Sequence, residues 1–206
     1  MDNRTAYNQW SKTYDQMKNK TRDLEAEALR SLLGKVDFDS CLEIGCGTGK
    51  NTQWLASRAS RVTAVDFSEE MIAKAKAKDL PLHVEFVVAD VTKTWDFTKQ
   101  KYDLVSFSLV LEHLEDLNHI FQEASKVLSP NGILYLGELH PFKQYLGSKA
   151  RFETPEGEHK LDCFTHHFSD YIFVGKMNGF RVEEVKEAFW EAEITPQVLA
   201  LIMRRL

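Results

Sequence analysis

Short apolar runs alternate with segments of helical periodicity along most of the chain. The first such segment spans residues 21–33, where Leu24 and Ala28 recur at helical spacing. Gly34 is placed to end this helix. The apolar run at 40–45 that follows is short enough to indicate a buried strand, so the chain begins as a helix followed by a strand.

The same alternation continues toward the C-terminus. Ser68 is a natural N-cap for the helix after it, and Gly179 is placed to close a later one. Predicted helices cover 51–59, 69–77, 116–128 and 168–178, and a turn signature stands at 129–132. Predicted strands cover 61–66, 83–90, 102–108, 133–138, 180–189 and 198–205. The interval 139–164 has no clear period.

Strands that alternate with helices predict an α/β fold whose mostly parallel sheet is covered by helices on both faces. The last two strands are joined without a convincing helix, so one of them is expected to run antiparallel as an edge hairpin. With 206 residues, the chain is expected to form one domain, 1–206. In such a sheet, ligands bind beyond the carboxyl ends of the strands.

Composition and charge narrow the class of protein. The chain is 43% hydrophobic and 28% charged with a net charge of −5, which disfavours a protein that holds nucleic acid through bulk charge. Its three cysteines are an odd number without paired metal-ligand spacing. We find neither an apolar run of membrane-spanning length nor a signal-peptide core. We therefore expect a cytoplasmic protein with no nucleic-acid or membrane partner.

A glycine-rich loop, Gly-Cys-Gly-Thr-Gly-Lys at 45–50, follows the first predicted strand. A dinucleotide loop would have its third glycine one residue later, where Lys50 stands, and the spacing also fails for a nucleotide-phosphate loop. Glu43, within the strand before it, would repel a pyrophosphate and attract a cation. The loop therefore fits a phosphate ligand poorly.

Acidic residues close the next two predicted strands. Asp66, some 20 residues after the loop, is placed to accept hydrogen bonds from ribose hydroxyls. Asp90 and the backbone of Val91 are placed to read the edge of an adenine, and Phe67 to cover its face. These residues fit a ligand that has an adenosine and a positive charge but no phosphates.

Four motifs in this order resemble class I S-adenosylmethionine-dependent methyltransferases. They are Leu-Glu-Ile-Gly-Cys-Gly-Thr-Gly at 42–49, Val-Asp-Phe-Ser-Glu-Glu-Met at 65–71, Ala-Asp-Val at 89–91 and Leu-Val-Leu-Glu-His-Leu-Glu-Asp at 109–116. The likeness is greatest to the bacterial small-molecule branch that includes quinone-biosynthesis enzymes. It implies a Rossmann-like three-layer sandwich, with a seven-stranded sheet whose last strand is inserted antiparallel.

The resemblance also implies a cofactor site and an N-terminal helical lid over residues 1–34. For Trp10 and Tyr14, plain packing of an N-terminal helix stays an equal alternative, and for His113 a structural or cofactor-positioning role is preferred to that of a base. The expected cofactor-binding residues are Tyr7, Trp10, Tyr14, Glu43, Gly45, Gly47, Asp66, Phe67, Asp90, Val91, Ser108 and His113.

The acceptor site is expected in an insertion at 139–167. His140 and His166 are the first candidates for acceptor contact or general base, with Glu138, Tyr145 and Phe152 as further candidates for the pocket. Cys163, His140, His166 and His167 together would offer metal ligands, but the family resemblance of the segment 164–171 favours a protein without a metal.

The expected function is in-line methyl transfer from S-adenosylmethionine to a small-molecule acceptor, by a monomer or homodimer. Three alternatives stay open. The first is a non-catalytic regulatory protein that binds the cofactor, and the second is a dinucleotide-dependent oxidoreductase, which Lys50 disfavours. The third is a nucleic-acid methyltransferase, disfavoured by the acidic balance and by the lack of an Asn/Asp-Pro-Pro-aromatic motif.

Overall fold

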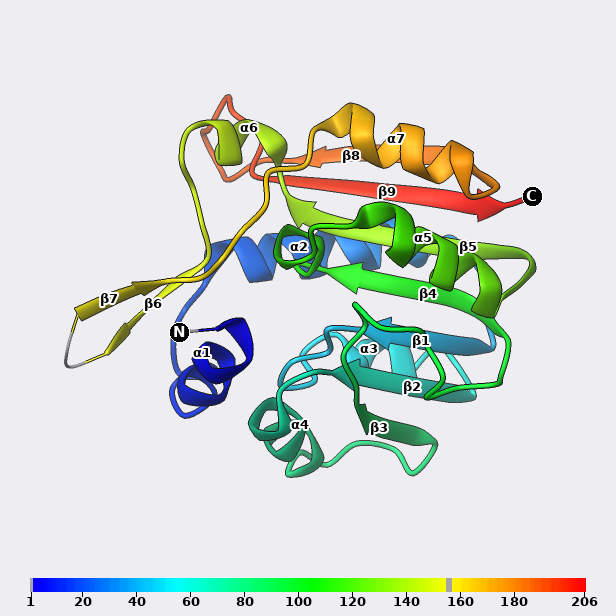
Figure 1. The fold of residues 1–206 in the computed structure, drawn as a ribbon, viewed down its shortest axis with the longest axis horizontal. Helices are drawn as coiled ribbons and strands as arrows, with labels where there is room; N and C mark the ends of the chain where they lie inside the picture. Colours follow the sequence, from blue (N-terminus) through cyan, green and yellow to red (C-terminus); the bar gives the residue numbers. More distant parts are fainter. Residues whose placement is uncertain (1, 155–156) are drawn as a thin grey trace.

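The computed structural model describes residues 2–154 and 157–206 and is built around a seven-stranded sheet (Figure 1). The strand order is β3-β2-β1-β4-β5-β9-β8, and of these seven strands only β9 runs opposite to the other six. The strands are β1 (Ser40–Ile44), β2 (Arg61–Asp66), β3 (Val84–Val88), β4 (Tyr102–Ser108), β5 (Leu128–Leu139), β8 (Phe180–Ala188) and β9 (Val198–Arg205). The predicted α/β fold is confirmed. The antiparallel strand is inserted between β5 and β8, so β8 forms the edge.

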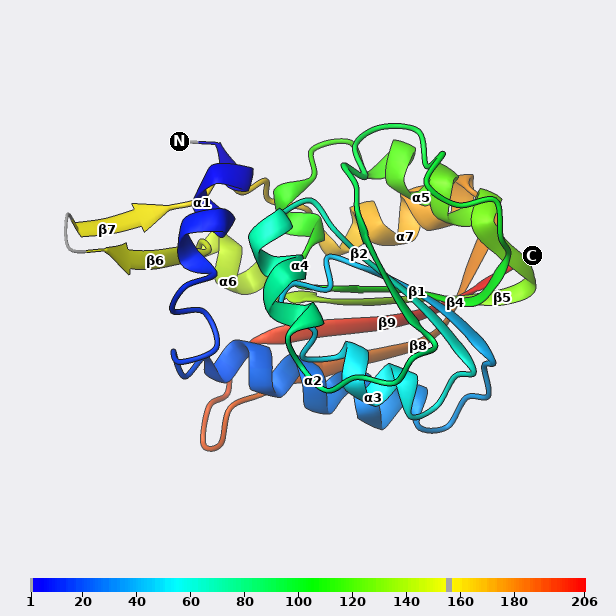
Figure 2. The same cartoon turned by 90° about the horizontal axis from the view of Figure 1, so that it is seen from below.

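Helices cover both faces of the sheet, which gives three layers (Figure 2). On one face lie α2 (Lys20–Leu33) and α3 (Thr52–Ala56), and on the other lie α5 (Leu117–Val127) and α7 (Phe168–Met177). The helix α4 (Glu69–Lys76) packs on β2 and β3. Among the described residues, none of these helices is both long and apolar enough to cross a membrane.

Helix α2 belongs to the core layer of the domain. Asn19 caps its first turn by accepting hydrogen bonds from the amides of Thr21 and Arg22. Its buried Leu29 and Leu33 join the apolar cluster between helix and sheet. Of the predicted lid 1–34, the part before α2 and the start of α2 lie beside the carboxyl ends of the strands, whereas the rest of α2 packs along the sheet (Figure 1). Residue 1 of that range is outside the described residues.

The C-terminal half contains structure that the periodicity missed. Strand β5 begins at Leu128 rather than at 133, because the predicted turn is a bulge within the strand with Asn131 at a φ of 61°. Three short elements occupy the interval without a period: α6 (Pro141–Tyr145), β6 (Arg151–Thr154) and β7 (Gly157–Lys160). Positions 155–156 of the predicted insertion lie outside the described residues.

The N-terminal helix α1 (Asn3–Trp10) packs against this hairpin of β6 and β7. The indole of Trp10 stacks on the ring of Phe152, with centroids 5.2 Å apart. Buried Ala6 and Leu161 complete this small apolar cluster. Helix α1 and the hairpin both lie at the end of the sheet where the parallel strands terminate (Figures 1 and 2).

Candidate functional site

A pocket lies at the carboxyl ends of β1, β2 and β4, beneath helix α1. This is the edge at which ligands were expected to bind in a parallel sheet. Every predicted cofactor-binding residue except Trp10 lines it, namely Tyr7, Tyr14, Glu43, Gly45, Gly47, Asp66, Phe67, Asp90, Val91, Ser108 and His113.

The glycine loop forms the wall between β1 and β2. The amides of Gly45 and Cys46 donate to the carbonyl of Val65 at 2.7 and 3.0 Å. Gly45 has a φ of +70°, and a Cβ there would lie 2.2 Å from Val110, so close packing requires glycine. Gly47 has a φ of +53°, and a Cβ there would lie more than 4 Å from every described residue beyond its chain neighbours. Its face is therefore open to the pocket.

Two buried carboxylates form the floor of the pocket. Glu43 accepts a hydrogen bond from Thr52 Oγ1 at 2.5 Å, and Glu25 of α2 accepts one from Asn51 Nδ2 at 3.0 Å. Burial raises the pKa of Glu43 to about 8 and that of Glu25 to about 7. The hydrogen-bond donors to these two carboxylates, Asn51 and Thr52, are neutral and do not cancel a negative charge. A ligand with a positive charge is therefore favoured at this part of the pocket.

Asp66 is placed by backbone amides at the end of β2. Its Oδ2 accepts from the amide of Gly47 at 2.9 Å and its Oδ1 from that of Ser68 at 2.8 Å. Burial raises the pKa of Asp66 to about 6 even against these hydrogen bonds. Each oxygen retains a further lone pair, so the carboxylate can accept hydroxyl groups from a ligand.

The aromatic and acidic residues expected around an adenine occupy the next part of the wall. Phe67 meets Tyr7 edge-on, with ring centroids 5.7 Å apart. Asp90 is half-buried and accepts hydrogen bonds from the amide and hydroxyl of Thr92. Although burial opposes them, these hydrogen bonds hold the pKa of Asp90 below its usual value.

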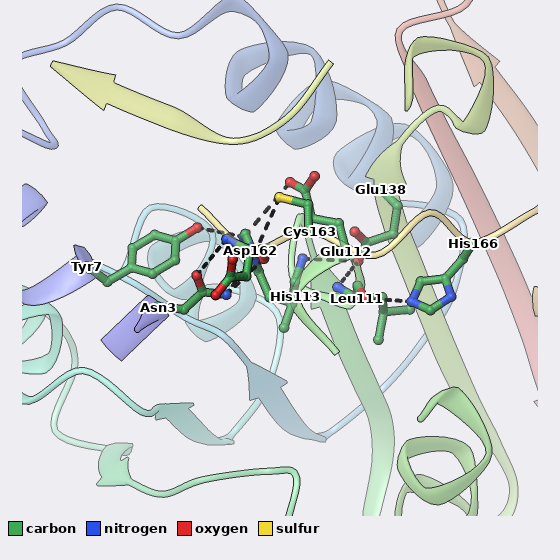
Figure 3. Close-up of polar contacts among 10 residues, drawn as sticks. Asn3, Tyr7, Leu111, Glu112, His113, Glu138, Asp162, Cys163 and His166 are labelled. Carbon is green, nitrogen blue, oxygen red and sulfur yellow. Dashed lines mark hydrogen bonds and ion pairs between the residues drawn. The ribbon is translucent and has the colours of Figure 1, made fainter. Parts of the chain in front are cut away.

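His113 lies where helix α1 meets the short 3₁₀ helix η1 (Leu111–His113) (Figure 3). Its Nε2 is 2.9 Å from the hydroxyl of Tyr7. Glu138 holds η1 in place, because its Oε1 accepts from the amides of Val110 and Leu111 at 3.1 and 3.0 Å. Burial raises the pKa of Glu138 to about 8.

Two basic side chains that sequence reasoning did not assign also line the pocket. Arg22 lies over the ring of Tyr14 at 4.0 Å and donates to two backbone carbonyls, while its buried Nε has no partner among the described residues. Lys50 forms an ion pair with Asp23. Arg22 and Lys50 can therefore offer hydrogen-bond donors to a negatively charged group of a ligand in the pocket.

Three predicted site residues do not line the pocket. Trp10 is buried against Phe152, one layer behind Tyr7 and Tyr14. His140 caps α6, with its Nε2 3.0 Å from Glu187. His166 is buried with its Nε2 2.7 Å from the carbonyl of Leu114. Because local hydrogen bonds hold both histidines away from the pocket, their positions give no support to a catalytic role.

Cys163, His140, His166 and His167 do not form a group of potential metal ligands among the described residues. The partners of the three histidines differ, since Nδ1 of His167 lies 2.9 Å from the hydroxyl of Tyr145. In the described part of the chain, one group of three potential ligands lies within 4.8 Å, and it consists of Glu112, His113 and Cys163. The prediction of a protein without a metal is not tested by this arrangement and stays a prediction.

The most informative residue missed in the sequence is Glu25. It is 1% exposed, and it lies four residues before Leu29 on the buried stripe of α2. A carboxylate among apolar helix positions could have indicated a buried functional group. The sequence does not show, however, that this part of α2 lies beside the pocket.

Comparison with known proteins supports the assignment of the fold and the motifs. Residues 42–136 match the family model described as a methyltransferase domain. The chain is 28% identical over 152 residues to a ubiquinone biosynthesis O-methyltransferase of Pelagibacter ubique, covering 70% of this chain and 62% of that protein. It is 31% identical over 132 residues to the thiol S-methyltransferase TMT1B of Rattus norvegicus, covering 62% and 53%. The matched region thus spans less than two thirds of these relatives.

A solved structure extends the likeness of the fold to nearly the whole chain. The DhpI–SAM–HEP complex superposes with a TM-score of 0.78 at 22% identity, covering 98% of this chain and 95% of that one. This likeness concerns the fold, whereas the domain match at 42–136 covers the region that contains the four sequence motifs.

Proposed function

We propose that this chain, whose residues 42–136 match a methyltransferase domain, is a class I S-adenosylmethionine-dependent enzyme that transfers a methyl group from S-adenosylmethionine to a small-molecule acceptor. The observation that carries this proposal is the pocket floor. Glu25 and Glu43 are buried side by side with Asp66 around the open face of Gly47, and all three carboxylates have a raised pKa. A cationic adenosyl ligand relieves this accumulation of negative charge.

The residues fit the methionine end of the cofactor. Glu25 and Glu43 offer acceptors for its ammonium group, and the buried Oδ1 of Asn51, which has no partner among the described residues, offers another. Arg22 and Lys50 offer donors for its carboxylate. The two signs of charge in the pocket thus match a zwitterionic amino acid.

The other residues fit the adenosine end. Asp66 accepts the ribose hydroxyls, while Phe67 covers the base and Asp90 with Val91 reads its edge. Ser108, which ends β4, borders the space between the two ends of the ligand. This assignment keeps the predicted roles of the residues that line the pocket.

When bound, S-adenosylmethionine supplies a methyl group on a sulfonium whose departing thioether needs no proton. The chain therefore has to align an acceptor and exclude water, and positioning can supply much of the rate acceleration. Tyr7 of α1 and Tyr14 in the turn after it border the pocket, and Trp10 behind them joins α1 to the hairpin through Phe152. We assign these elements the role of a lid.

Three observations support a small acceptor. By their names, the relatives reported above serve ubiquinone biosynthesis and methylate thiols. The net charge of −5 disfavours nucleic acid as an acceptor. Helix α1 covers the pocket at the end of the sheet where an acceptor approaches. We place the activity in the cytoplasm, in keeping with three free cysteines, and we propose that a monomer or homodimer performs it.

The test is transfer of a labelled methyl group. The purified protein is incubated with methyl-tritiated S-adenosylmethionine and a cell extract divided into low-mass and macromolecular fractions. We expect label to enter the low-mass fraction, and Glu43→Gln to reduce it. Label that enters only nucleic acid or protein would overturn the small-molecule acceptor, whereas no transfer to either fraction despite cofactor binding would support a non-catalytic protein.

A further inference from the structure

The two ring nitrogens of His113 face different kinds of group (Figure 3). Nδ1 lies 3.1 Å from the backbone carbonyl of Asp162, and Nε2 lies 2.9 Å from the hydroxyl of Tyr7. A carbonyl oxygen only accepts hydrogen bonds, so the short contact at Nδ1 requires a proton on that nitrogen. The neutral ring then has its lone pair on Nε2, where it faces Tyr7.

Asn3 strengthens this choice of tautomer. Its Nδ2 donates to the carbonyl of Asp162 at 2.9 Å, and its Oδ1 accepts from the amide of the same residue at 3.0 Å. Asn3 Nδ2 and Cys163 Sγ are farther from Nδ1 of His113, at 3.4 and 3.9 Å, than the carbonyl is. Asn3 therefore holds the carbonyl of Asp162 in position, and this carbonyl accepts the hydrogen bond from Nδ1 of His113.

Tyr7 connects this lone pair to the pocket. Its ring and that of His113 both line the pocket wall and meet edge-on, with centroids 5.5 Å apart. Burial holds the pKa of Tyr7 well above its usual value, with Glu112 and Asp66 adding to the effect. The hydroxyl thus keeps its proton at neutral pH and can release it to His113 only while it receives another.

We propose that Tyr7 and His113 form a proton relay that deprotonates a hydroxyl or thiol acceptor during methyl transfer. The inference rests on the proposed function. As the acceptor oxygen or sulfur bonds to the methyl carbon, the bond from that carbon to the donor sulfur breaks, and its electron pair stays on the sulfur. The acceptor proton passes to Tyr7, and the Tyr7 proton passes to Nε2 of His113. The positive charge thereby moves from the donor to the imidazole.

The surroundings of His113 suit the charged product of this step. Glu112 is 6% exposed, its Oε1 lies 3.9 Å from Nε2, and its buried Oε2 has no hydrogen-bond partner in the described chain. Asp66 and Cys163 are the other titratable groups near the ring. An ionised Glu112 attracts the positive charge that the relay places on the imidazole, although burial raises the pKa of Glu112. The proton is returned to solvent after the products leave.

The relay narrows the class of acceptor. A neutral amine attacks a methyl group through its free lone pair and needs no base beforehand. An alcohol, a phenol or a thiol has to lose a proton as it is methylated, and this is the task that a bare Nε2 performs. The acceptor we infer is therefore a neutral hydroxyl or thiol compound.

The first test reads the tautomer directly by ¹⁵N NMR of the histidine rings in the protein without ligand, near pH 8. We expect His113, assigned by loss of its signals in His113→Gln, to have a proton on Nδ1 and none on Nε2. Tyr7→Phe should shift the Nε2 signal, and Asn3→Ala should mix the two tautomers. A proton on Nε2, or an unchanged Nε2 signal in Tyr7→Phe, would overturn the relay.

A second Tyr–His pair provides the matched control. The hydroxyl of Tyr145 lies 2.9 Å from Nδ1 of His167, outside the pocket, and Tyr145 is exposed. Tyr145→Phe should alter the signals of His167 and leave those of His113 unchanged. A change at His113 of the size caused by Tyr7→Phe would mean that the spectra report general disturbance, which contradicts the specific contact.

Turnover with simple probes tests the chemistry. Phenol, 2-mercaptoethanol and propylamine are offered with S-adenosylmethionine, and formation of S-adenosylhomocysteine is measured. Turnover of phenol or the thiol should fall about 100-fold or more in Tyr7→Phe and His113→Gln, the range that general-base catalysis supplies. Methylation of propylamine alone would overturn the relay and leave the proposed function intact. Failure of the wild-type protein to bind S-adenosylhomocysteine would instead contradict the proposed function, while the NMR result still decides the relay.

Discussion

The carboxylate of Glu25 accepts a hydrogen bond from the side-chain amide of Asn51 across 3.0 Å, which joins helix α2 to the loop that follows the three glycines. Glu25 also accepts from the hydroxyl of Tyr135 on β5 at 3.1 Å. The buried side chain of Glu25 thus connects helix α2 to strand β5 and to the loop that lines the pocket.

Removing the charge of Glu25 should weaken cofactor binding more than it weakens the fold. Glu25→Gln keeps an acceptor for Asn51 but loses the charge that we assign to the cofactor ammonium. A charged hydrogen bond contributes about 1.5–3 kcal/mol, so affinity for S-adenosylhomocysteine should fall roughly tenfold to a hundredfold. Titration calorimetry measures this. Glu27→Gln, an exposed position on the same helix, is the control, and equal affinities of the two variants would remove Glu25 from the site.

The stability of the protein without ligand should fall as pH rises between about 5 and 8. The pKa values of Glu25, Asp66 and Glu43, about 7, 6 and 8, all lie above their unfolded values, so in this window the folded state binds more protons than the unfolded state. Urea unfolding at several pH values measures the slope. Glu43→Gln should flatten this slope, and a stability that rises across this window would contradict the raised pKa values of these buried groups.

Ligand binding should reverse that trend. A cationic ligand favours ionised carboxylates, so the rise in melting temperature caused by S-adenosylmethionine should be larger at pH 8 than at pH 6. Thermal unfolding with and without saturating ligand provides the comparison. A larger rise at pH 6 would show that the ligand does not place its positive charge against Glu25 and Glu43.

The two glycines of the loop should respond differently to alanine. Both have positive φ, which costs an alanine about 1–2 kcal/mol, but Gly45→Ala also brings a Cβ within 2.2 Å of Val110. Gly45→Ala should therefore reduce the free energy of unfolding by about 1–3 kcal/mol more than Gly47→Ala does. Gly47→Ala should lose more cofactor affinity than stability, because its methyl group enters the pocket. Urea unfolding and calorimetry separate the two effects, and the opposite order would contradict the loop geometry.

Docking of helix α1 should depend on Phe152. Phe152→Ala removes the ring on which Trp10 stacks, and a buried Phe→Ala change typically costs about 3–5 kcal/mol. Because this cluster lies outside the main core, we expect faster proteolysis within α1 and weaker cofactor binding. Phe173→Ala, at an exposed position on α7, is the control. Unchanged protease resistance of α1 would show that the hairpin does not hold the lid.

Much of the fold follows from local pattern. Strands such as β2 and β4 lie where short apolar runs predict them, because both of their faces are buried. The helix capped by Ser68 begins where its capping residue predicts. The hairpin of β6 and β7 was missed because it stands away from the sheet and buries only a few residues, such as Phe152, against α1. A short hairpin of this kind has no long alternation to detect.

The site was predictable where chemistry coincides with strand ends. The positions of Asp66 and Gly47 in the pocket lining follow from the sequence, since parallel strands terminate at a common edge, and their roles toward the cofactor stay a proposal. Glu25 and Arg22 were missed because their approach to the pocket depends on how α2 crosses the sheet. His140 and His166 were selected by residue type near a strand end, but neighbouring carbonyl and carboxylate groups hold their rings elsewhere.

Titration calorimetry with S-adenosylhomocysteine and, separately, with NAD⁺ tests the central claim most directly. We predict that S-adenosylhomocysteine binds at one site per chain, that Asp66→Asn weakens this binding strongly, and that NAD⁺ gives no binding heat. Binding of NAD⁺ with no binding of S-adenosylhomocysteine would contradict the account.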